Sequence, residues 1–225
     1  ARDFQKNADR LSAALTRETK EAPRRRLLQE IILLCERGVE EIEGLGDQAF
    51  MAGIHAALAA ALVELSALES DEKRKADGIH QAEDHAELVE WLVRDGTSNL
   101  ATVGTLHWLA EIRRNAAARV SGVQEQAMLH RLERTQQLLA QVSESYLAKK
   151  KQAMRDLYAA RALENGSRLV DEPAEQHKVL AVALWQVQAA QQLALKIGDA
   201  PLVAQCQEAL AQIESAMSPL RGEYA

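Results

Sequence analysis

Apolar residues recur at helical spacing along most of the chain, and short turns containing Gly and Asp separate one apolar stripe from the next. Near the N-terminus, Phe4, Ala8, Leu11 and Leu15 follow one another three or four residues apart, which places them on one face of a helix. Glycine readily takes the left-handed conformation that ends a helix, and Asp caps the helix that follows. This alternation predicts a series of helices joined by short turns.

The composition excludes the other fold classes. Of the 225 residues, 40 are Ala and 31 are Leu, and both are strong helix formers. Aromatic residues make up 4% of the chain, with 11 Gly and 4 Pro, which is too few strand and turn formers for a mainly β protein. Apolar residues at 47% are too many for intrinsic disorder. We therefore expect an all-α protein.

Stop and cap residues divide the chain into about eight helices. They are expected near residues 1–21, 24–43, 47–68, 71–95, 97–121, 123–164, 171–197 and 199–217. The lysine-rich run 148–152 interrupts the apolar face of the sixth helix, and it predicts a break or a solvated bridge there. Short turns make sequential helices antiparallel, so the chain is expected to form helical hairpins.

Two of the expected hairpin junctions share a pattern. Residues 45–47 are Leu-Gly-Asp and residues 197–199 are Ile-Gly-Asp, and a Leu-Ala pair follows each Asp at the same offset, at 58–59 and at 210–211. This pattern resembles a hairpin junction of a tetratricopeptide-like (TPR-like) α-solenoid, in which a Leu and a small residue pack against the paired helix. The resemblance implies hairpins stacked as a solenoid or right-handed superhelix that binds a protein or peptide. A compact up-down helical bundle is the alternative.

The length admits one large domain or two small ones. We expect one all-helical domain over residues 1–225, with a soft division near 121–123 or 165–172 as the alternative.

No charged-plus-apolar signal pattern stands at the N-terminus. The Ala-rich stretch 49–68 contains Glu64, so this stretch is expected to be a packed helix rather than a membrane span. A cytoplasmic location is expected. Cys35 and Cys206 are expected to be buried hydrophobes.

Charge alternates in sign along the chain, whose net charge is −6. Residues 27–95 carry 5 basic and 16 acidic side chains, whereas residues 96–170 carry 11 basic and 6 acidic ones. The basic segment 113–168 suggests a face for nucleic acid or an acidic partner. The alternative is solvated helix faces that the acidic segment partly neutralises, and we favour it because base-stacking aromatics are missing there.

The sequence contains no recognisable pattern for catalysis, metal or cofactor binding. No Gly-rich phosphate loop, GxSxG elbow, HExxH, CxxCH or EF-hand pattern occurs. His80, Glu83, Asp84 and Glu87 form an acidic turn, for which a hydrated helix face is favoured over a cation site. We expect no enzyme, no catalytic residue, no metal and no cofactor.

The functional prediction rests on the tryptophans. Trp91 and Trp108 flank the turn at Gly96, 17 residues apart, and Trp185 also stands among apolar residues. Core packing is the favoured interpretation, and an aromatic anchor for a partner helix or peptide is the alternative.

We expect a non-catalytic protein- or peptide-binding scaffold or regulatory interaction module, and homo-oligomerisation is compatible with it. The candidate contact residues are His55, Trp91, His107, Trp108, Arg113 and Arg114. His55 and His107 lie in apolar surroundings, which favours hydrogen-bonded core or groove histidines over catalysts. One alternative is a helical-bundle sensor that binds a small ligand in a cavity between helices. The second is a nucleic-acid-associated protein that uses the segment 113–168.

Overall fold

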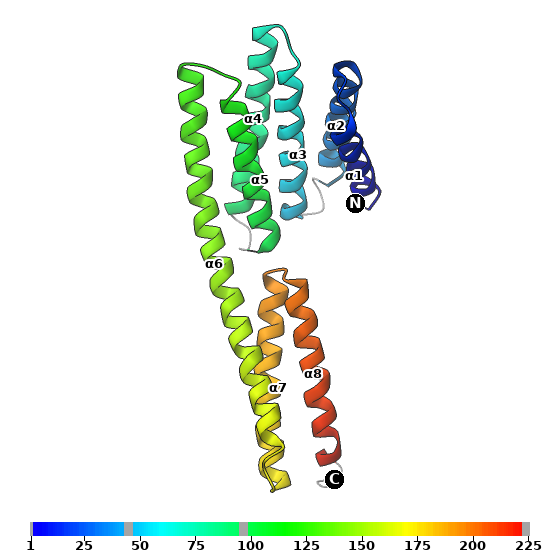
Figure 1. Ribbon diagram of the computed structural model, residues 1–225, viewed down its shortest axis with the longest axis vertical. Helices are drawn as coiled ribbons and strands as arrows, with labels where there is room; N and C mark the ends of the chain where they lie inside the picture. The colour runs from blue at the N-terminus through cyan, green and yellow to red at the C-terminus, as the bar shows by residue number, and fades with distance from the viewer. Residues whose placement is uncertain (1, 43–46, 95–98, 222–225) are drawn as a thin grey trace. The chain divides into compact units, whose positions relative to one another are not determined.

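The computed structural model describes residues 2–42, 47–94 and 99–221, and within these ranges the chain forms eight α-helices and no strand (Figure 1). The expected all-α class is confirmed. The helices are α1 (Arg2–Arg17), α2 (Glu21–Ile42), α3 (Gln48–Ala67), α4 (Glu72–Arg94), α5 (Leu100–Ala117), α6 (Val123–Ser167), α7 (Pro173–Lys196) and α8 (Ala200–Arg221).

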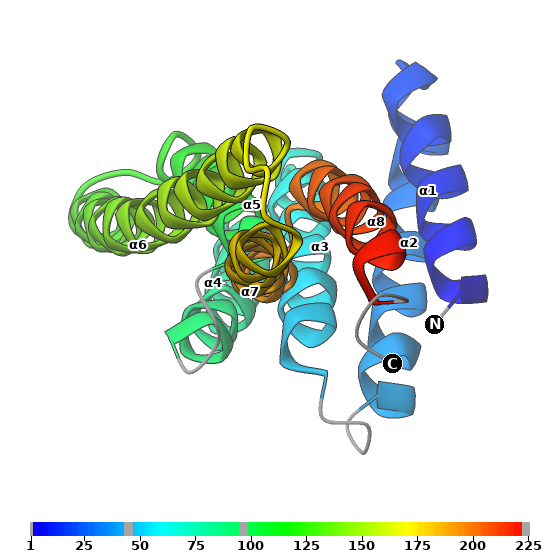
Figure 2. The same cartoon turned by 90° about the horizontal axis from the view of Figure 1, so that it is seen from below.

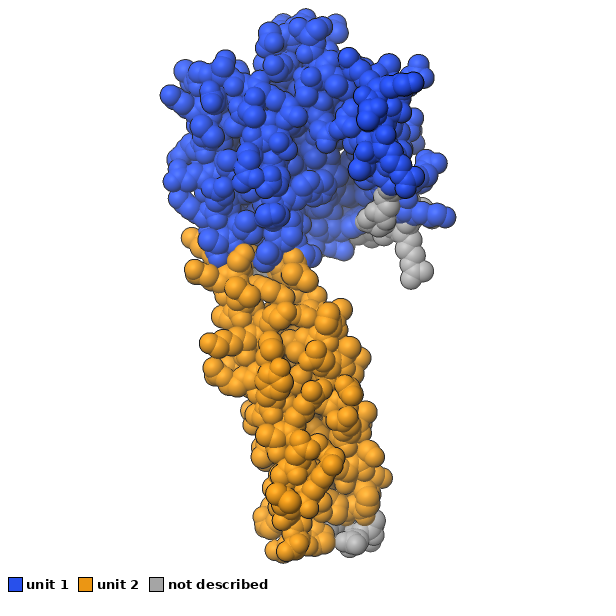
Figure 3. All heavy atoms as spheres, viewed as in Figure 1, with its two compact units in different colours: residues 1–96, 101–140 blue, residues 97–100, 141–225 orange. Residues whose placement is uncertain are grey.

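The chain divides into two compact units (Figure 3). Unit 1 comprises residues 1–96 and 101–140, and so contains α1 to α5 and the first part of α6; unit 2 comprises residues 97–100 and 141–225. The expected single all-helical domain, with a soft division near 121–123 or 165–172, stays a prediction; the two compact units divide elsewhere, inside α6. Within α6 the division lies between residues 140 and 141, and no Gly or Pro stands near that point to mark it.

Helix α6 is continuous over 45 residues. The run 148–152 is helical, so the expected break there is wrong. Lys150 of this run forms an ion pair with Asp199, with 2.7 Å between Nζ and Oδ2. The helix also continues through Gly166, past the expected end at 164.

Asp residues cap the helices at three of the expected positions. Asp47 Oδ1 accepts a hydrogen bond from the Phe50 amide at 3.0 Å, Asp71 Oδ1 one from Lys73 at 2.8 Å, and Asp199 Oδ1 one from Leu202 at 3.1 Å. Each satisfies an amide that has no partner within its helix. The expected turn and cap residues Gly44, Gly46, Asp95, Gly96, Thr97 and Ser98 lie outside the described residues.

Two other turns need glycine. Gly122 has φ +64° and Gly198 has φ +67°, a conformation that side chains with a Cβ rarely adopt. Proline marks helix ends less sharply than expected, since α2 includes Pro23 in its first turn and α8 continues past Pro219 to Arg221. Proline is tolerated in the first turn, as at Pro23, because its missing N–H would have no helical partner there.

Helix α3 lies at the centre of unit 1, packed against α2 and α4, while α1 packs on α2 (Figures 1 and 2). Its small side chains Ala52, Ala56 and Ala59 are buried, which lets neighbouring helices approach closely. By length and composition alone α3 could cross a membrane, and half of its most apolar window is buried inside the protein.

In unit 2 the later part of α6 packs with α7 and α8 around a core of small and medium side chains. Leu157, Val187 and Ile213 are among its buried members. Ala211 is exposed, so the expectation that it permits tight pairing, as the buried Ala59 does, is wrong. Ala209 occupies the core in its place. Cys35 and Cys206 are free and buried, as expected.

Candidate functional site

All three tryptophans of the chain are exposed. Trp91 on α4 exposes 58% of its surface, Trp108 on α5 42% and Trp185 on α7 69%. The core-packing interpretation is therefore wrong for all three. Tryptophan is on average a well-buried residue and is over-represented among the residues that dominate binding energies. Their exposure leaves the aromatic-anchor interpretation.

An apolar cavity of about 300 Å³ opens in unit 1 between α1, α2 and α3, and Trp108 reaches it from α5. The two phenylalanines of the chain, Phe4 and Phe50, both line it. Their rings meet edge to face, with centroids 5.7 Å apart and planes at 77°, an arrangement that aromatic pairs prefer. Aliphatic side chains such as Ile31 and Ile54 complete the wall.

The cavity wall offers little polar chemistry. Its polar side chains are the Ser12 hydroxyl and the Cys35 thiol, and none of the described lining residues is charged. Burial, assisted by the nearby Glu36 carboxylate, raises the pKa of Cys35 to about 11. The thiol is therefore protonated at neutral pH and is not a nucleophile. The cavity can hold an apolar group, and its described lining supplies no acid, base or nucleophile.

Two glycines shape this region. A Cβ added at Gly38 of α2 would lie 2.6 Å from the Phe4 ring, so the glycine lets that ring approach the helix. A Cβ added at Gly53 of α3 would meet nothing within 4 Å, because Gly53 lines the cavity. Gly53 therefore leaves room that any larger side chain would occupy.

Next to this cavity in sequence, His55 of α3 pairs with His85 of α4. The Nδ1 atoms of the two rings are 3.1 Å apart, so one donates a hydrogen bond to the other. The two rings stack with their centroids 5.2 Å apart. Burial, assisted by the neighbouring His85, lowers the pKa of His55 to about 4. Burial also lowers the pKa of His85, although Asp84 and Glu36 oppose this. The expectation of a hydrogen-bonded core histidine is confirmed for His55, whereas His107 is exposed.

Arg113 is the centre of a buried ionic cluster that joins α4, α5 and α6 within unit 1. Its guanidinium is 1% exposed and pairs with Glu83 and Glu90, which are 4% and 2% exposed. Thr135 Oγ1 accepts a hydrogen bond from Arg113 at 2.5 Å and donates one to Glu90 at 2.8 Å. Burial raises the pKa of Glu83, while Arg113 opposes that shift. Arg113, expected to contact a partner, is instead engaged inside the unit.

Other cations of the basic segment also pair with acidic side chains of their own unit. Arg131 lies 3.6 Å from Glu87, and Arg134 lies 3.3 Å from Glu90. In unit 2 Arg161 lies 3.7 Å from Glu208. The acidic turn supplies partners for arginines here: Glu83 faces inward to Arg113, whereas His80 and Asp84 are exposed. These ion pairs agree with the favoured interpretation, in which acidic side chains partly neutralise the basic helix faces.

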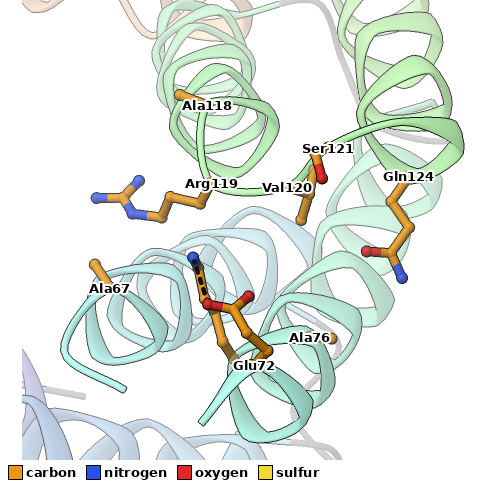
Figure 4. Close-up of a pocket in the computed structure, with 9 residues that line it drawn as sticks. Ala67, Glu72, Ala76, Ala118, Arg119, Val120, Ser121 and Gln124 are labelled. Carbon is orange, nitrogen blue, oxygen red and sulfur yellow. Dashed lines mark ion pairs between the residues drawn. The ribbon is translucent and has the colours of Figure 1, made fainter. Parts of the chain in front are cut away.

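A second, polar pocket of about 540 Å³ lies where α3 ends, α4 begins and α5 passes into α6 (Figure 4). Glu72 and Lys75 form an ion pair on one side at 3.6 Å. On the other side Arg119 donates to the Asn115 carbonyl at 2.6 Å. The Glu72 side chain is 85% exposed, so the pocket holds its charges in water, where they discriminate weakly between ligands.

The six predicted contact residues do not share one environment. Two are buried in separate clusters, namely His55 and Arg113, and the other four are exposed: Trp91, His107, Trp108 and Arg114. Among them only Trp108 lines the cavity. Sequence reasoning missed Phe4, Phe50 and His85, since only the packing of distant helices brings these side chains together.

Comparison with protein-family models, with curated proteins and with solved structures found no match. The resemblance of the two hairpin junctions to a TPR-like solenoid therefore stays a prediction. Among the described residues, no group of three or more His, Cys, Asp or Glu side chains could hold a metal ion.

Proposed function

We propose that the chain is a non-catalytic module that binds a protein or peptide partner through its exposed tryptophans. The proposal rests on the exposure of every tryptophan in the chain. Leu88, 43% exposed, stands three residues before Trp91 and therefore beside it on α4. The two side chains form a small apolar surface that a partner helix or peptide could cover.

The nucleic-acid alternative has less support. The arginines that would contact phosphates are in part paired with glutamates, as Arg113, Arg131 and Arg134 show. Releasing them for a phosphate would leave Glu83 and Glu90 buried without a partner, which is costly.

Site-specific photo-crosslinking tests the proposed function. A photoreactive phenylalanine analogue replaces Trp91 or Trp108, and the matched controls carry it at Gln81 of α4 or Asn115 of α5, which are also exposed. We expect one or a few discrete crosslinked partners from the tryptophan positions and none of these from the controls. In a reconstituted complex, Trp91→Ala or Trp108→Ala should weaken binding about 30-fold, the effect of losing a dominant contact.

Identical crosslinking patterns at all four positions would contradict the proposal. So would a partner whose affinity is unchanged when Trp91 and Trp108 are both replaced by Ala.

A further inference from the structure

We propose that the cavity between α1, α2 and α3 is a binding site for a small, neutral, apolar molecule. This binding goes beyond the proposed partner binding: the two share Trp108, whereas Trp91 does not line the cavity. The inference rests on three features of the cavity: its volume, the absence of charge in its described lining, and the aromatic rings gathered there.

The volume suits a ligand larger than benzene. The cavity measures about 300 Å³, whereas an apolar cavity of about 150 Å³ is enough to hold benzene. Small-molecule sites begin at about 300 Å³. A bicyclic aromatic or a medium-length hydrocarbon chain therefore matches the space.

The lining favours a neutral ligand. A carboxylate or ammonium group buried there would lose its hydration without gaining an opposite charge, which is strongly unfavourable. Cys35, with its pKa raised to about 11, stays uncharged, and Ser12 can satisfy at most a single hydroxyl or carbonyl of the ligand. Water gains little in such a cavity because it needs two or more polar partners.

The aromatic rings favour a flat or extended hydrocarbon. Phe4, Phe50 and Trp108 come from three different helices and all line the same space. The chain has only 2 Phe and 3 Trp, so this cavity holds a large share of its aromatic surface. A ligand that packs against these rings would bury a large apolar area and gain the corresponding hydrophobic free energy.

The test uses the neutral fluorescent probe N-phenyl-1-naphthylamine and the full chain. Trp91 and Trp185 are changed to Phe, so that Trp108 is the only tryptophan and acts as energy donor to the bound probe. We expect saturable binding of one probe molecule per chain with energy transfer from Trp108. 1-Decanol should displace the probe, whereas decanoate at the same concentration should not, because the described lining residues include no cation.

Position 53 supplies a matched pair of variants. Gly53→Leu fills the space above the glycine and should weaken probe binding at least about tenfold. Gly53→Ala adds one methyl group and should leave the affinity within about twofold. Leu and Ala are both better helix formers than Gly, so both variants should fold, which circular dichroism and the melting temperature check. Ala57→Leu, which fills the same cavity from the next turn of α3, is the second blocking variant.

Unsaturable probe binding, or equal affinity in the parent, Gly53→Leu and Ala57→Leu, would overturn the inference. Equal displacement by 1-decanol and decanoate would overturn the neutral ligand class. The proposed partner binding is tested independently at Trp91, which does not line the cavity, by crosslinking at that position and by the partner affinity of Trp91→Ala.

Discussion

Arg113 and Arg114 show how one step along a helix decides what a residue does. Both stand on α5, but the Arg113 side chain is 1% exposed and the Arg114 side chain 53%. Arg113 holds Glu83 and Glu90 in the interior, whereas Arg114 pairs with Glu111 of its own helix in water. An exposed pair contributes little to stability, but removing one partner of a buried cluster leaves the others uncompensated.

We expect Arg113→Met to lower the free energy of unfolding by about 3 kcal/mol, because it removes the buried cation of two buried carboxylates. Their remaining cations, Arg131 for Glu83 and Arg134 for Glu90, are partly exposed and lie 3.7 Å and 3.3 Å away. The matched variant Arg114→Met should change it by less than about 0.5 kcal/mol. Adding Glu83→Gln and Glu90→Gln to Arg113→Met should restore most of the loss, since neutral amides are easier to bury. Urea unfolding of the parent, the two single variants and the triple variant measures these changes in stability. Equal losses of stability in Arg113→Met and Arg114→Met would contradict the prediction.

His55 predicts a loss of stability in mild acid. An unfolded histidine takes up its proton near pH 6.5, whereas the pKa of His55 in the folded chain is lowered to about 4. The unfolded state therefore binds the proton first, and the contribution of neutral His55 is present above about pH 6.5 and lost as the pH falls towards 4.

Between pH 7.5 and 4.5 the parent should lose about 2 kcal/mol more stability than His55→Asn. His107→Asn, at an exposed histidine of α5, should keep the pH dependence of the parent. Urea midpoints at the two pH values give the comparison. Parallel profiles for the parent and His55→Asn would show that the pair does not titrate in this range.

At the scale of helices, alanine has two different roles in this chain. Ala59 of α3 is fully buried, and its small size lets neighbouring helices approach. Ala211 stands at the same distance after its capping Asp, yet it is exposed on α8. The caps at Asp47 and Asp199 are confirmed, but the equal offsets placed only one of the two alanines in a helix interface.

We expect Ala59→Leu to lower the free energy of unfolding by about 1–3 kcal/mol, because the added methyl groups overpack a closed interface. Ala211→Leu should change it by less than about 0.5 kcal/mol. Thermal melts of the two variants test this directly. If both variants have the melting temperature of the parent, the α3 interfaces are packed more loosely than the burial of Ala59 indicates.

For the molecule as a whole, local signals were predictable and distant pairings were not. Asp47, Asp71 and Asp199 cap helices as their positions next to apolar stripes indicate. In contrast, His55 and His85 are 30 residues apart, as are Glu83 and Arg113, and no motif joins such pairs. They meet because α3, α4 and α5 pack together, which depends on the fit of many side chains.

The cavity and the division inside α6 were unpredictable for related reasons. A cavity is space that side chains from several helices fail to fill, and its lining extends from Phe4 to Trp108. The division at residue 140 falls within an unbroken helix, and helix propensity carries no information about which neighbours each turn will have.

The ion pairs inside each unit also affect how fast partners can arrive. Opposite charges that are paired produce a field of short range, and at physiological salt the remaining surface charges are screened beyond about 8 Å. What an approaching molecule meets is the net charge of −6. A basic partner would therefore be drawn in faster as salt is lowered, and an acidic one would be slowed. Encounter kinetics at two salt concentrations would thus report the sign of the partner's charge before its identity is known.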